Sequence, residues 1–354
     1  MINYQELNKY GWQAYFSSVK PEVPDRFEVG RIGIENKTNY LIYGRFGEMS
    51  AFLRGNMIKS KNFPKVGDWI LFTKLPNENR GVIEKILPRK TKLGRKDAEQ
   101  NTEQIMAANV DLLFIVQSLG HDFNLSRLER YLVLAKSSDT KPVVVLNKID
   151  LKEDYSHELE QVKQLASGLP VFAMSAKTGE GIEQIKEIIE PGLTMAFVGS
   201  SGVGKSSLIN AILGIDLQKT AEVRIVDGRG KHTTTKREMI VLPQGGILID
   251  TPGMRELGAL PDLASLNETF EDLEQLANQC KFRNCDHQKS EGCAIQAALE
   301  DRTLDRKRYL NFLKLKREQG FLESKEDSKK SRARKVKEKR LHKKLKKIIK
   351  AKYQ

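Results

Sequence analysis

The chain has 354 residues and a formal net charge of +14 at neutral pH. That length is enough for two or three domains, each with a core of its own. Its first residues are polar, and no apolar run approaches the roughly 20 residues of a membrane-spanning helix. We therefore expect a cytoplasmic monomer without a secretory signal or membrane contact. The cysteines number only three, which argues against a disulfide framework.

The N-terminal region is predicted to form a small β-barrel. Between residues 26 and 88, five short alternating segments are separated by glycine, asparagine and proline, as strands are separated by turns. Five strands in this length suit the OB-fold, and a small barrel of another type fits the periodicity as well. We expect an RNA-binding OB-fold barrel in residues 1–90 and a polar, basic linker over about 88–100.

From about residue 105 the pattern changes to apolar strands that alternate with amphipathic helices. Continuous apolar segments such as VDLLFIVQ and PVVVLNKID are separated by helical segments such as SRLERYLVLAKSS. This alternation predicts an α/β domain, a parallel sheet with helices on both faces. We assign residues 91–262 to it, and the chain after it becomes helical and polar.

A phosphate-binding loop is predicted where one of these strands ends. The segment GSSGVGKS fits the pattern G-x-x-x-x-G-K-[ST], with an apolar strand before it and a helix after it. Such a loop turns backbone N–H groups toward phosphate oxygens, and the helix N-terminus adds partial positive charge. Lys205 is expected to contact the β- and γ-phosphates, and Ser206 to bind Mg²⁺. A glycine-rich turn without a ligand is the alternative. The residues assigned to the loop are Gly199, Ser200, Ser201, Gly202, Val203, Gly204, Lys205, Ser206 and Ser207.

Two loops earlier in the chain predict that the bound base is guanine. Asp150 of NKID can accept hydrogen bonds from N1–H and the N2 amine of guanine, which adenine does not offer. The segment SAKTG, at the end of the next strand, can present backbone to the guanine O6. NKID alone also fits a simple strand-end turn, but three loops at three strand ends would form one nucleotide crevice. The residues assigned to the base are Asn147, Lys148, Ile149, Asp150, Ser175, Ala176 and Lys177.

The segments DGRGKHTTT and LIDTPG complete the predicted site. Asp250 is expected to hold Mg²⁺ and the Gly253 N–H to bond the γ-phosphate, while Thr234 is our choice for the hydroxyl that binds Mg²⁺. Small GTPases place a water-orienting glutamine where this chain has Met254, so His232 is the candidate catalytic residue. The alternative is that His232 faces solvent or an RNA phosphate. We expect slow intrinsic hydrolysis that a partner stimulates.

The cysteines and one histidine predict a metal site. The spacing Cys280-x4-Cys285-x-His287-x5-Cys293 offers three thiolates and an imidazole, which is a complete tetrahedral Zn²⁺ set. A closed set of four ligands is structural rather than catalytic. The alternative is a group of free buried thiols beside a surface histidine. We assign residues 263–324 to a helical zinc-binding domain.

The C-terminal segment over 325–354 is a basic tail. From residue 325 to residue 352 it carries fifteen lysines and arginines against three acidic residues. A cationic block of this density is typical of contact with polyanions, and we favour RNA over a membrane. A solvated tail and an interfacial helix both remain open, the latter because apolar residues follow helical spacing at Leu341, Leu345, Ile348 and Ile349.

Together, and in this order along the chain, these motifs resemble the RsgA family, also called YjeQ or YloQ. The resemblance covers nearly the whole chain and rests on LNKIDL, SAKTGEG, GSSGVGKSSLIN, GRGKHTTT, DTPG and CKFRNCDH with EGC. It implies a circularly permuted GTPase, in which the base-reading loops precede the phosphate loop. It also implies zinc ligands at the cluster above and a catalytic role for His232. The implied partners are GTP and GDP, the 30S subunit and 16S rRNA, in late subunit maturation.

Two other functions fit parts of the sequence. One is an RNA-binding assembly factor that uses GTP only as a regulatory ligand. The other is a small-molecule kinase with a phosphate loop, against which NKID and the loop after Asp250 argue, because both belong to GTP-binding domains.

Overall fold

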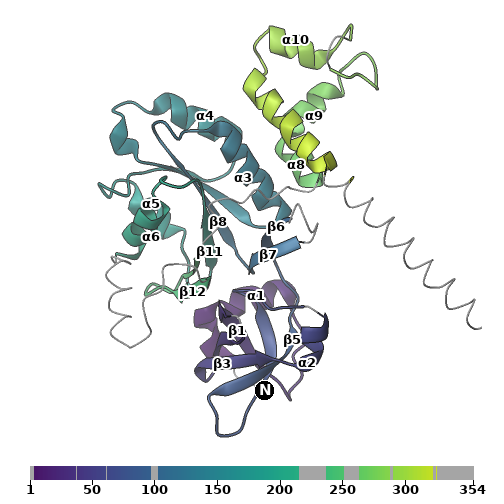
Figure 1. The fold of residues 1–354 in the computed structure, drawn as a ribbon. Coiled ribbons are helices and arrows are strands. Elements are labelled where there is room, and N and C mark those ends of the chain that lie inside the picture. The colour runs from purple at the N-terminus through teal and green to yellow at the C-terminus, as the bar shows by residue number, and fades with distance from the viewer. Residues whose placement is uncertain are drawn as a thin grey trace, which may run out of the picture. The chain divides into compact units, whose positions relative to one another are not determined.

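The structure is a computed structural model that describes residues 4–36, 38–60, 62–96, 103–214, 237–250, 263–287, 290–321 and 324. The chain divides into two compact units, Met1–Arg95 with Ile105–Ala259, and Lys96–Gln104 with Leu260–Gln354. The first holds a β-barrel and a sheet flanked by helices, and the second holds a group of helices (Figure 1). The predictions for the basic tail and for three further residues lie outside the described residues, namely His232, Thr234 and Gly253.

The first unit begins with the predicted five-stranded barrel. Its strands pair in the order β1-β2-β3-β5-β4, and β1 also pairs with β4, which closes the barrel as in an OB-fold. Alternate residues of these strands meet inside, where Ile32, Ile42 and Phe72 are fully buried. The elements are β1 (Glu28–Glu35), β2 (Tyr40–Gly44), β3 (Gly47–Leu53), α2 (Gly55–Ser60), β4 (Trp69–Lys74) and β5 (Arg80–Ile86).

Two short helices precede the barrel and were not predicted. They are η1 (Gln5–Tyr10) and α1 (Trp12–Val19). The Trp12 ring meets the Trp69 ring edge-on, with centroids 4.9 Å apart. The Tyr15 hydroxyl donates to the Pro88 carbonyl at 2.7 Å. Such short helices owe their stability to this packing rather than to their own sequence, which explains why periodicity did not reveal them.

The predicted parallel sheet follows the barrel. Five parallel strands lie in the order β10-β9-β8-β11-β13, and β12 pairs antiparallel with β13. Every residue of β11 is buried, as expected for a parallel strand covered on both faces. The strands are β8 (Leu112–Ser118), β9 (Lys141–Asn147), β10 (Val171–Ala173), β11 (Thr194–Val198), β12 (Glu238–Val241) and β13 (Ile247–Asp250).

Helices cover both faces of this sheet, as the alternating pattern predicted (Figure 1). In β8, Leu113 and Ile115 belong to one core cluster, which includes Leu128 of α3 and other residues of α3 and α4. Phe114 and Val116 belong to the other cluster, with residues of α5 and α6. The two-residue period of a strand thus divides its side chains between the two faces. The helices are α3 (Leu125–Ser137), α4 (Ser156–Ala166), α5 (Ile182–Glu187) and α6 (Lys205–Leu213).

The segment expected to be a linker contains a strand instead. β6 (Lys92–Lys96) pairs with β7 (Glu103–Ala108) in a two-stranded sheet. Leu93 is fully buried in the same core cluster as Leu113. The linker prediction was therefore wrong for residues 92–96. The strand was missed because a single buried apolar residue among polar ones does not produce a recognisable strand pattern.

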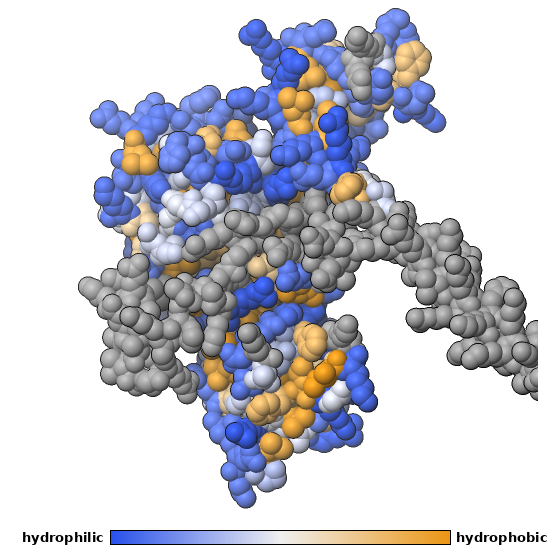
Figure 2. Space-filling view, in the orientation of Figure 1, coloured by the Kyte–Doolittle hydropathy of each residue, from blue (hydrophilic) through white to orange (hydrophobic). Residues whose placement is uncertain are grey.

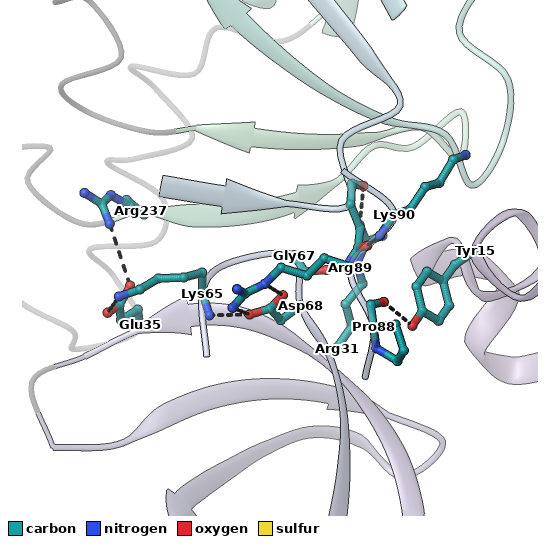
Figure 3. A network of polar contacts seen from close by, with 11 residues as sticks. Tyr15, Arg31, Glu35, Lys65, Gly67, Asp68, Pro88, Arg89, Lys90 and Arg237 are labelled. Atoms are coloured by element: carbon teal, nitrogen blue, oxygen red, sulfur yellow. Dashed lines mark hydrogen bonds and ion pairs between the residues drawn. The ribbon is translucent and has the colours of Figure 1, made fainter. Parts of the chain in front are cut away.

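The barrel and the parallel sheet are joined by strand pairing. Ile34 of β1 lies opposite Glu238 of β12, and Glu238 lies opposite Asp250 at the end of β13. Beside this ladder, Glu35 accepts a hydrogen bond from Lys65 at 2.5 Å and lies 3.8 Å from the Arg237 guanidinium (Figure 3). The barrel is therefore bonded to β12, and β12 pairs in turn with the strand that ends at the predicted magnesium ligand.

A buried arginine adds a second connection. Arg31, on β1, donates through Nε to the Gly67 carbonyl and through Nη1 to the Tyr10 carbonyl. Its Nη2 reaches the parallel-sheet region, donating to the Asn109 carbonyl at 3.2 Å and the Thr194 hydroxyl at 2.9 Å. Burial lowers the pKa of Arg31 to about 10, so the side chain stays charged at neutral pH. Figure 3 shows Arg31 and Gly67 beside the ion pair of Asp68 with Arg89.

Replacing Arg31 with alanine is expected to lower the free energy of unfolding of this unit by about 3 to 5 kcal/mol. The change would leave three buried acceptors without a donor from Arg31, namely the carbonyls of Tyr10 and Asn109 and the Thr194 hydroxyl. The Gly67 carbonyl would also lose its bond from Arg31 but keep the one from the Asn109 amide, and the unit would lose a buried charge. Urea unfolding followed by circular dichroism measures the loss. The matched control is Arg45→Ala, which removes a partly exposed pair with Glu28 and should cost below about 1 kcal/mol. Equal losses in the two variants would contradict the prediction.

The second unit is helical, as predicted for the region after the sheet. It contains α8 (Leu263–Thr269), α9 (Glu271–Ala277), α10 (Ala294–Glu300) and a helix over 306–321. Phe270 and Leu315 are fully buried, and the Phe270 ring lies 5.2 Å from that of Phe312. Among the described residues of the whole chain, no helix has the length and apolar character needed to cross a membrane.

Candidate nucleotide-binding site and metal centre

The phosphate loop follows β11 and leads into α6 at Lys205. Gly199 and Gly204 have φ angles of +148° and +92°, which side chains rarely adopt. A Cβ at Gly199 would lie 2.4 Å from the Val116 carbonyl oxygen, and one at Gly204 would lie 2.5 Å from the Asn147 amide nitrogen. The loop therefore needs glycine at both positions, for its backbone angles and for its close contact with neighbouring strand ends.

The Lys205 ammonium lies over the phosphate loop. It donates to the carbonyls of Gly199 and Ser200 at 2.7 and 2.6 Å. Ser206 and Ser207 are exposed at the start of α6, where the helix N-terminus carries partial positive charge. The cation and the helix end thus meet at one place, which is the arrangement that binds phosphate.

The first base-reading loop is bonded to the phosphate loop. Asn147, the last residue of β9, donates through Nδ2 to the Val203 carbonyl at 2.8 Å. The Lys148 ammonium donates to the Gly202 carbonyl at 2.6 Å. These residues lie more than fifty positions apart in the chain, so the fold brings the two predicted loops together. The loop order along the chain does not prevent them from forming one site.

The second base-reading loop orients Asp150. The buried Ser175 hydroxyl donates to Asp150 Oδ1 at 2.6 Å, and the Ala176 N–H donates to Asn147 Oδ1 at 3.0 Å. Asp150 is exposed, with Ile149 buried beside it. Lys177 is held through its backbone N–H, which donates to the Ser175 hydroxyl at 3.3 Å. The Asp150 carboxylate is thereby fixed at the protein surface where a base could meet it.

The structure places only part of the predicted magnesium site. Asp250 is exposed at the end of β13, next to β11 in the sheet. The other predicted members of this region are His232, Thr234 and Gly253, which lie outside the described residues. Their roles stay predictions.

One contact to the phosphate loop was not predicted. Asp122 lies in the loop that follows β8, and its Oδ2 accepts a hydrogen bond from the Ser200 hydroxyl. Its Oδ1 accepts from Arg127, in the first turn of α3, at 2.7 Å. No motif includes these residues. The rule that ligands bind at the carboxyl ends of parallel strands could have drawn attention to the loop after β8.

The three cysteines and His287 meet in the second unit. Their ligand atoms all lie within 4.8 Å of one another. The Cys280 sulfur is 3.5 Å from His287 Nδ1 and 4.0 Å from the Cys293 sulfur, and Cys293 is 3.6 Å from the same nitrogen. Ligands bound at about 2.0 to 2.3 Å around a tetrahedral ion would lie roughly 3.4 to 3.8 Å apart. The group could therefore hold a metal ion.

Local structure explains how this group is held. Cys293 caps the N-terminus of α10, and its sulfur accepts from the Gln296 N–H at 3.5 Å. Gln296 also donates through its side chain to the His287 carbonyl, and His287 has a φ of +57°. The His287 backbone lowers the pKa of Cys285, whereas burial raises the pKa of Cys293.

These features define a GTP-binding protein of the phosphate-loop class, with its base-reading loops before the phosphate loop and a cluster of possible metal ligands after it. The sequence model of the family described as RsgA GTPase matches residues 86–260. The chain belongs to this family of GTPases, as its similarity to whole relatives also shows.

Two relatives and two solved structures illustrate the similarity. Small ribosomal subunit biogenesis GTPase RsgA of Leptospira interrogans is 36% identical, over 98% of this chain and 97% of its own length. The RsgA 1 protein of Listeria innocua is 42% identical, over 89% and 90%. YjeQ from Thermotoga maritima matches with a TM-score of 0.62 and 29% identity, over 83% and 98%. YloQ, a circularly permuted GTPase, matches with a TM-score of 0.58 and 26% identity, over 84% of this chain and 96% of its own.

Proposed function

We propose that this GTPase acts in the late maturation of the small ribosomal subunit, where it binds the 30S subunit and 16S rRNA. The observation that carries the proposal is the orientation of Asp150 by Ser175 in a loop that is bonded to the phosphate loop. This arrangement suits a guanine nucleotide, and relatives that match 89% or more of this chain are named as small ribosomal subunit biogenesis GTPases. The protein would act in the cytoplasm as a monomer, with GTP and GDP as its ligands.

The nucleotide would be held as the sequence predicted. Lys205 would neutralise the β- and γ-phosphates, and Ser206 with Asp250 would hold Mg²⁺, which supplies charge neutralisation during phosphoryl transfer. Ser206 is exposed at the start of α6, which follows β11, and Asp250 is exposed at the end of the neighbouring strand β13, which supports this assignment. Thr234, Gly253 and His232 would complete the site, and their roles rest on the sequence alone.

The barrel is proposed to contact RNA. At the turn between β2 and β3, Phe46 is 44% exposed, and cations lie 4.7 Å (Arg45) and 4.4 Å (Lys74) from its ring centre. Exposed aromatic rings beside cations suit single-stranded RNA, whose bases stack on rings and whose phosphates attract positive charge. Figure 2 shows apolar side chains of the barrel surrounded by hydrophilic ones.

The metal of the cysteine cluster is proposed to be zinc. Three thiolates and one imidazole are a donor set that zinc prefers, and four protein ligands leave no open position for a substrate. Cys280, Cys285, His287 and Cys293 would hold it, and its role would be to stabilise the helices of the second unit.

GTP hydrolysis by the full-length protein, with and without purified 30S subunits, tests the proposal. We expect an intrinsic rate of roughly 10⁻⁴ to 10⁻² s⁻¹, because Met254 stands where small GTPases have the glutamine that orients the attacking water. With 30S subunits the rate should rise at least about tenfold. A partner on the barrel could act on Asp250 through the ladder from Ile34 to Glu238.

The control is the 50S subunit, which should not stimulate hydrolysis. Stimulation by both subunits, or a fast free enzyme, would contradict the proposed partner or the proposed slow intrinsic turnover. Binding to 30S subunits without any stimulation would instead favour the alternative in which GTP is only a regulatory ligand.

A further inference from the structure

The phosphate loop is held from outside by a carboxylate that no nucleotide motif contains. Asp122 Oδ2 accepts the hydrogen of the Ser200 hydroxyl, across 78 positions of sequence. Ser200 is the second residue of the loop, directly after the glycine that leaves β11. The loop after β8 and the phosphate loop therefore share a hydrogen bond.

The carboxylate itself is fixed in place. Arg127 donates to Asp122 Oδ1 at 2.7 Å, and the backbone N–H of Arg127 is bonded to the Asn124 side chain, which caps α3. Burial acts to raise the pKa of Asp122, but the hydrogen bonds from Arg127 and Ser200 outweigh it and bring the pKa below its usual value. Asp122 is thus an ionised acceptor attached to the first turn of a packed helix.

The same loop residue also holds the phosphate-binding lysine. The Ser200 carbonyl accepts from the Lys205 ammonium at 2.6 Å, while the Ser200 hydroxyl is held by Asp122. One residue thereby connects the rigid start of α3 to the cation that is expected to meet the phosphates. A phosphate loop whose lysine and backbone are already held in the binding conformation loses less conformational entropy when the ligand binds.

We propose that Asp122, fixed by Arg127, is a positioning residue that holds Ser200 and, through it, keeps Lys205 and the phosphate loop in their binding conformation. The inference rests on the proposed nucleotide site, and it adds the positioning of that site by the start of α3. Asp122 does not touch the nucleotide in this scheme, because its two oxygens are directed to Ser200 and Arg127.

A charge effect would act in the opposite direction. A carboxylate near bound phosphates repels them, so its removal would tighten nucleotide binding. The ion pair with Arg127 offsets the charge of Asp122, and positioning should therefore dominate. The two effects predict opposite changes in affinity, which makes them separable in one measurement.

The experiment measures the affinity of the full-length protein for fluorescent GDP and for a fluorescent non-hydrolysable GTP analogue. We expect Asp122→Ala and Ser200→Ala each to raise both dissociation constants by about tenfold, the effect of losing one hydrogen bond to a charged group. The double variant should be little weaker than either single variant, because both remove the same interaction. Asp122→Asn, which keeps an acceptor oxygen, should be affected less than Asp122→Ala.

Hydrolysis separates positioning from a purely structural role. KM for GTP should rise in Asp122→Ala, with kcat close to the wild-type value, because the anchor stabilises the bound ground state and the transition state equally. Circular dichroism verifies that the variants are folded. The matched control is Glu183→Gln, which removes the charge of an exposed pair with Lys186 on α5 and should leave affinity unchanged.

Three results would overturn the inference. They are wild-type affinity in Ser200→Ala, tighter binding in Asp122→Ala, and additive losses in the double variant. If the wild-type protein itself bound no guanine nucleotide, the proposed function would fail instead. The two failures are therefore distinguishable.

Discussion

Replacing Asp150 with asparagine is expected to weaken GTP binding by on the order of 10² to 10⁴-fold. A guanine base offers two donors to this carboxylate, and each hydrogen bond to a charged group is worth about 1.5 to 3 kcal/mol. The Ser175 hydroxyl that holds Oδ1 does not need the charge, so the loop itself should keep its conformation. The loss should therefore appear in recognition of the base rather than in folding.

The same variant should gain affinity for xanthosine triphosphate relative to GTP. Xanthine has a carbonyl where guanine has its N2 amine, and the asparagine amide can donate to it where a carboxylate cannot. Competition of GTP, XTP and ATP against a fluorescent nucleotide measures the change. Asp154→Asn is the control, because this nearby carboxylate accepts a hydrogen bond from the Ser156 backbone N–H at the start of α4 and has no predicted contact with the base. Unchanged GTP affinity in Asp150→Asn would show that Asp150 does not read the base.

Removing the proposed zinc ion from the cysteine cluster is expected to unfold the second unit while the first stays folded. Structural zinc contributes about 10 to 16 kcal/mol of apparent folding free energy in small domains, which exceeds the stability of most of them. The described part of this unit has a small core, centred on residues such as Phe270 and Leu315. Without the ion, no bond to a metal would offset the cost of holding four ligand side chains close together.

A strong chelator, with limited proteolysis and metal analysis before and after, tests this expectation. One zinc ion per chain should be released, and cleavage should appear within residues 263–321, while guanine-nucleotide binding persists. Cys280→Ser should have the same effect as the chelator. His157→Ala is the matched control, since this histidine lies exposed on α4. A second unit that resists proteolysis without any bound metal would contradict the structural role.

Local patterns in the sequence were sufficient for much of the site. Glycines in GSSGVGKS predicted a phosphate-binding loop, and the structure has positive φ angles at Gly199 and Gly204 in this segment. Segments with alternating apolar residues predicted the five barrel strands, and continuous apolar segments predicted the parallel strands. A strand buried on one face has apolar residues at every second position, and a strand buried on both faces is apolar throughout. The spacing of Cys280 to Cys293 predicted a four-ligand cluster, since short loops can bring such near neighbours together.

Other features depended on residues that are far apart in the chain. The bond between Asp122 and Ser200, and that between Arg31 and Thr194, join positions separated by 78 and 163 residues. The pairing of β12 with β1 likewise depends on two sheet edges that meet only in the folded chain. Residue order was enough to predict which loops suit a nucleotide and a metal, because those loops need particular residues at short spacing. The contacts that hold the loops in place became visible only in the folded chain, because they arise from packing between elements that are far apart in the sequence.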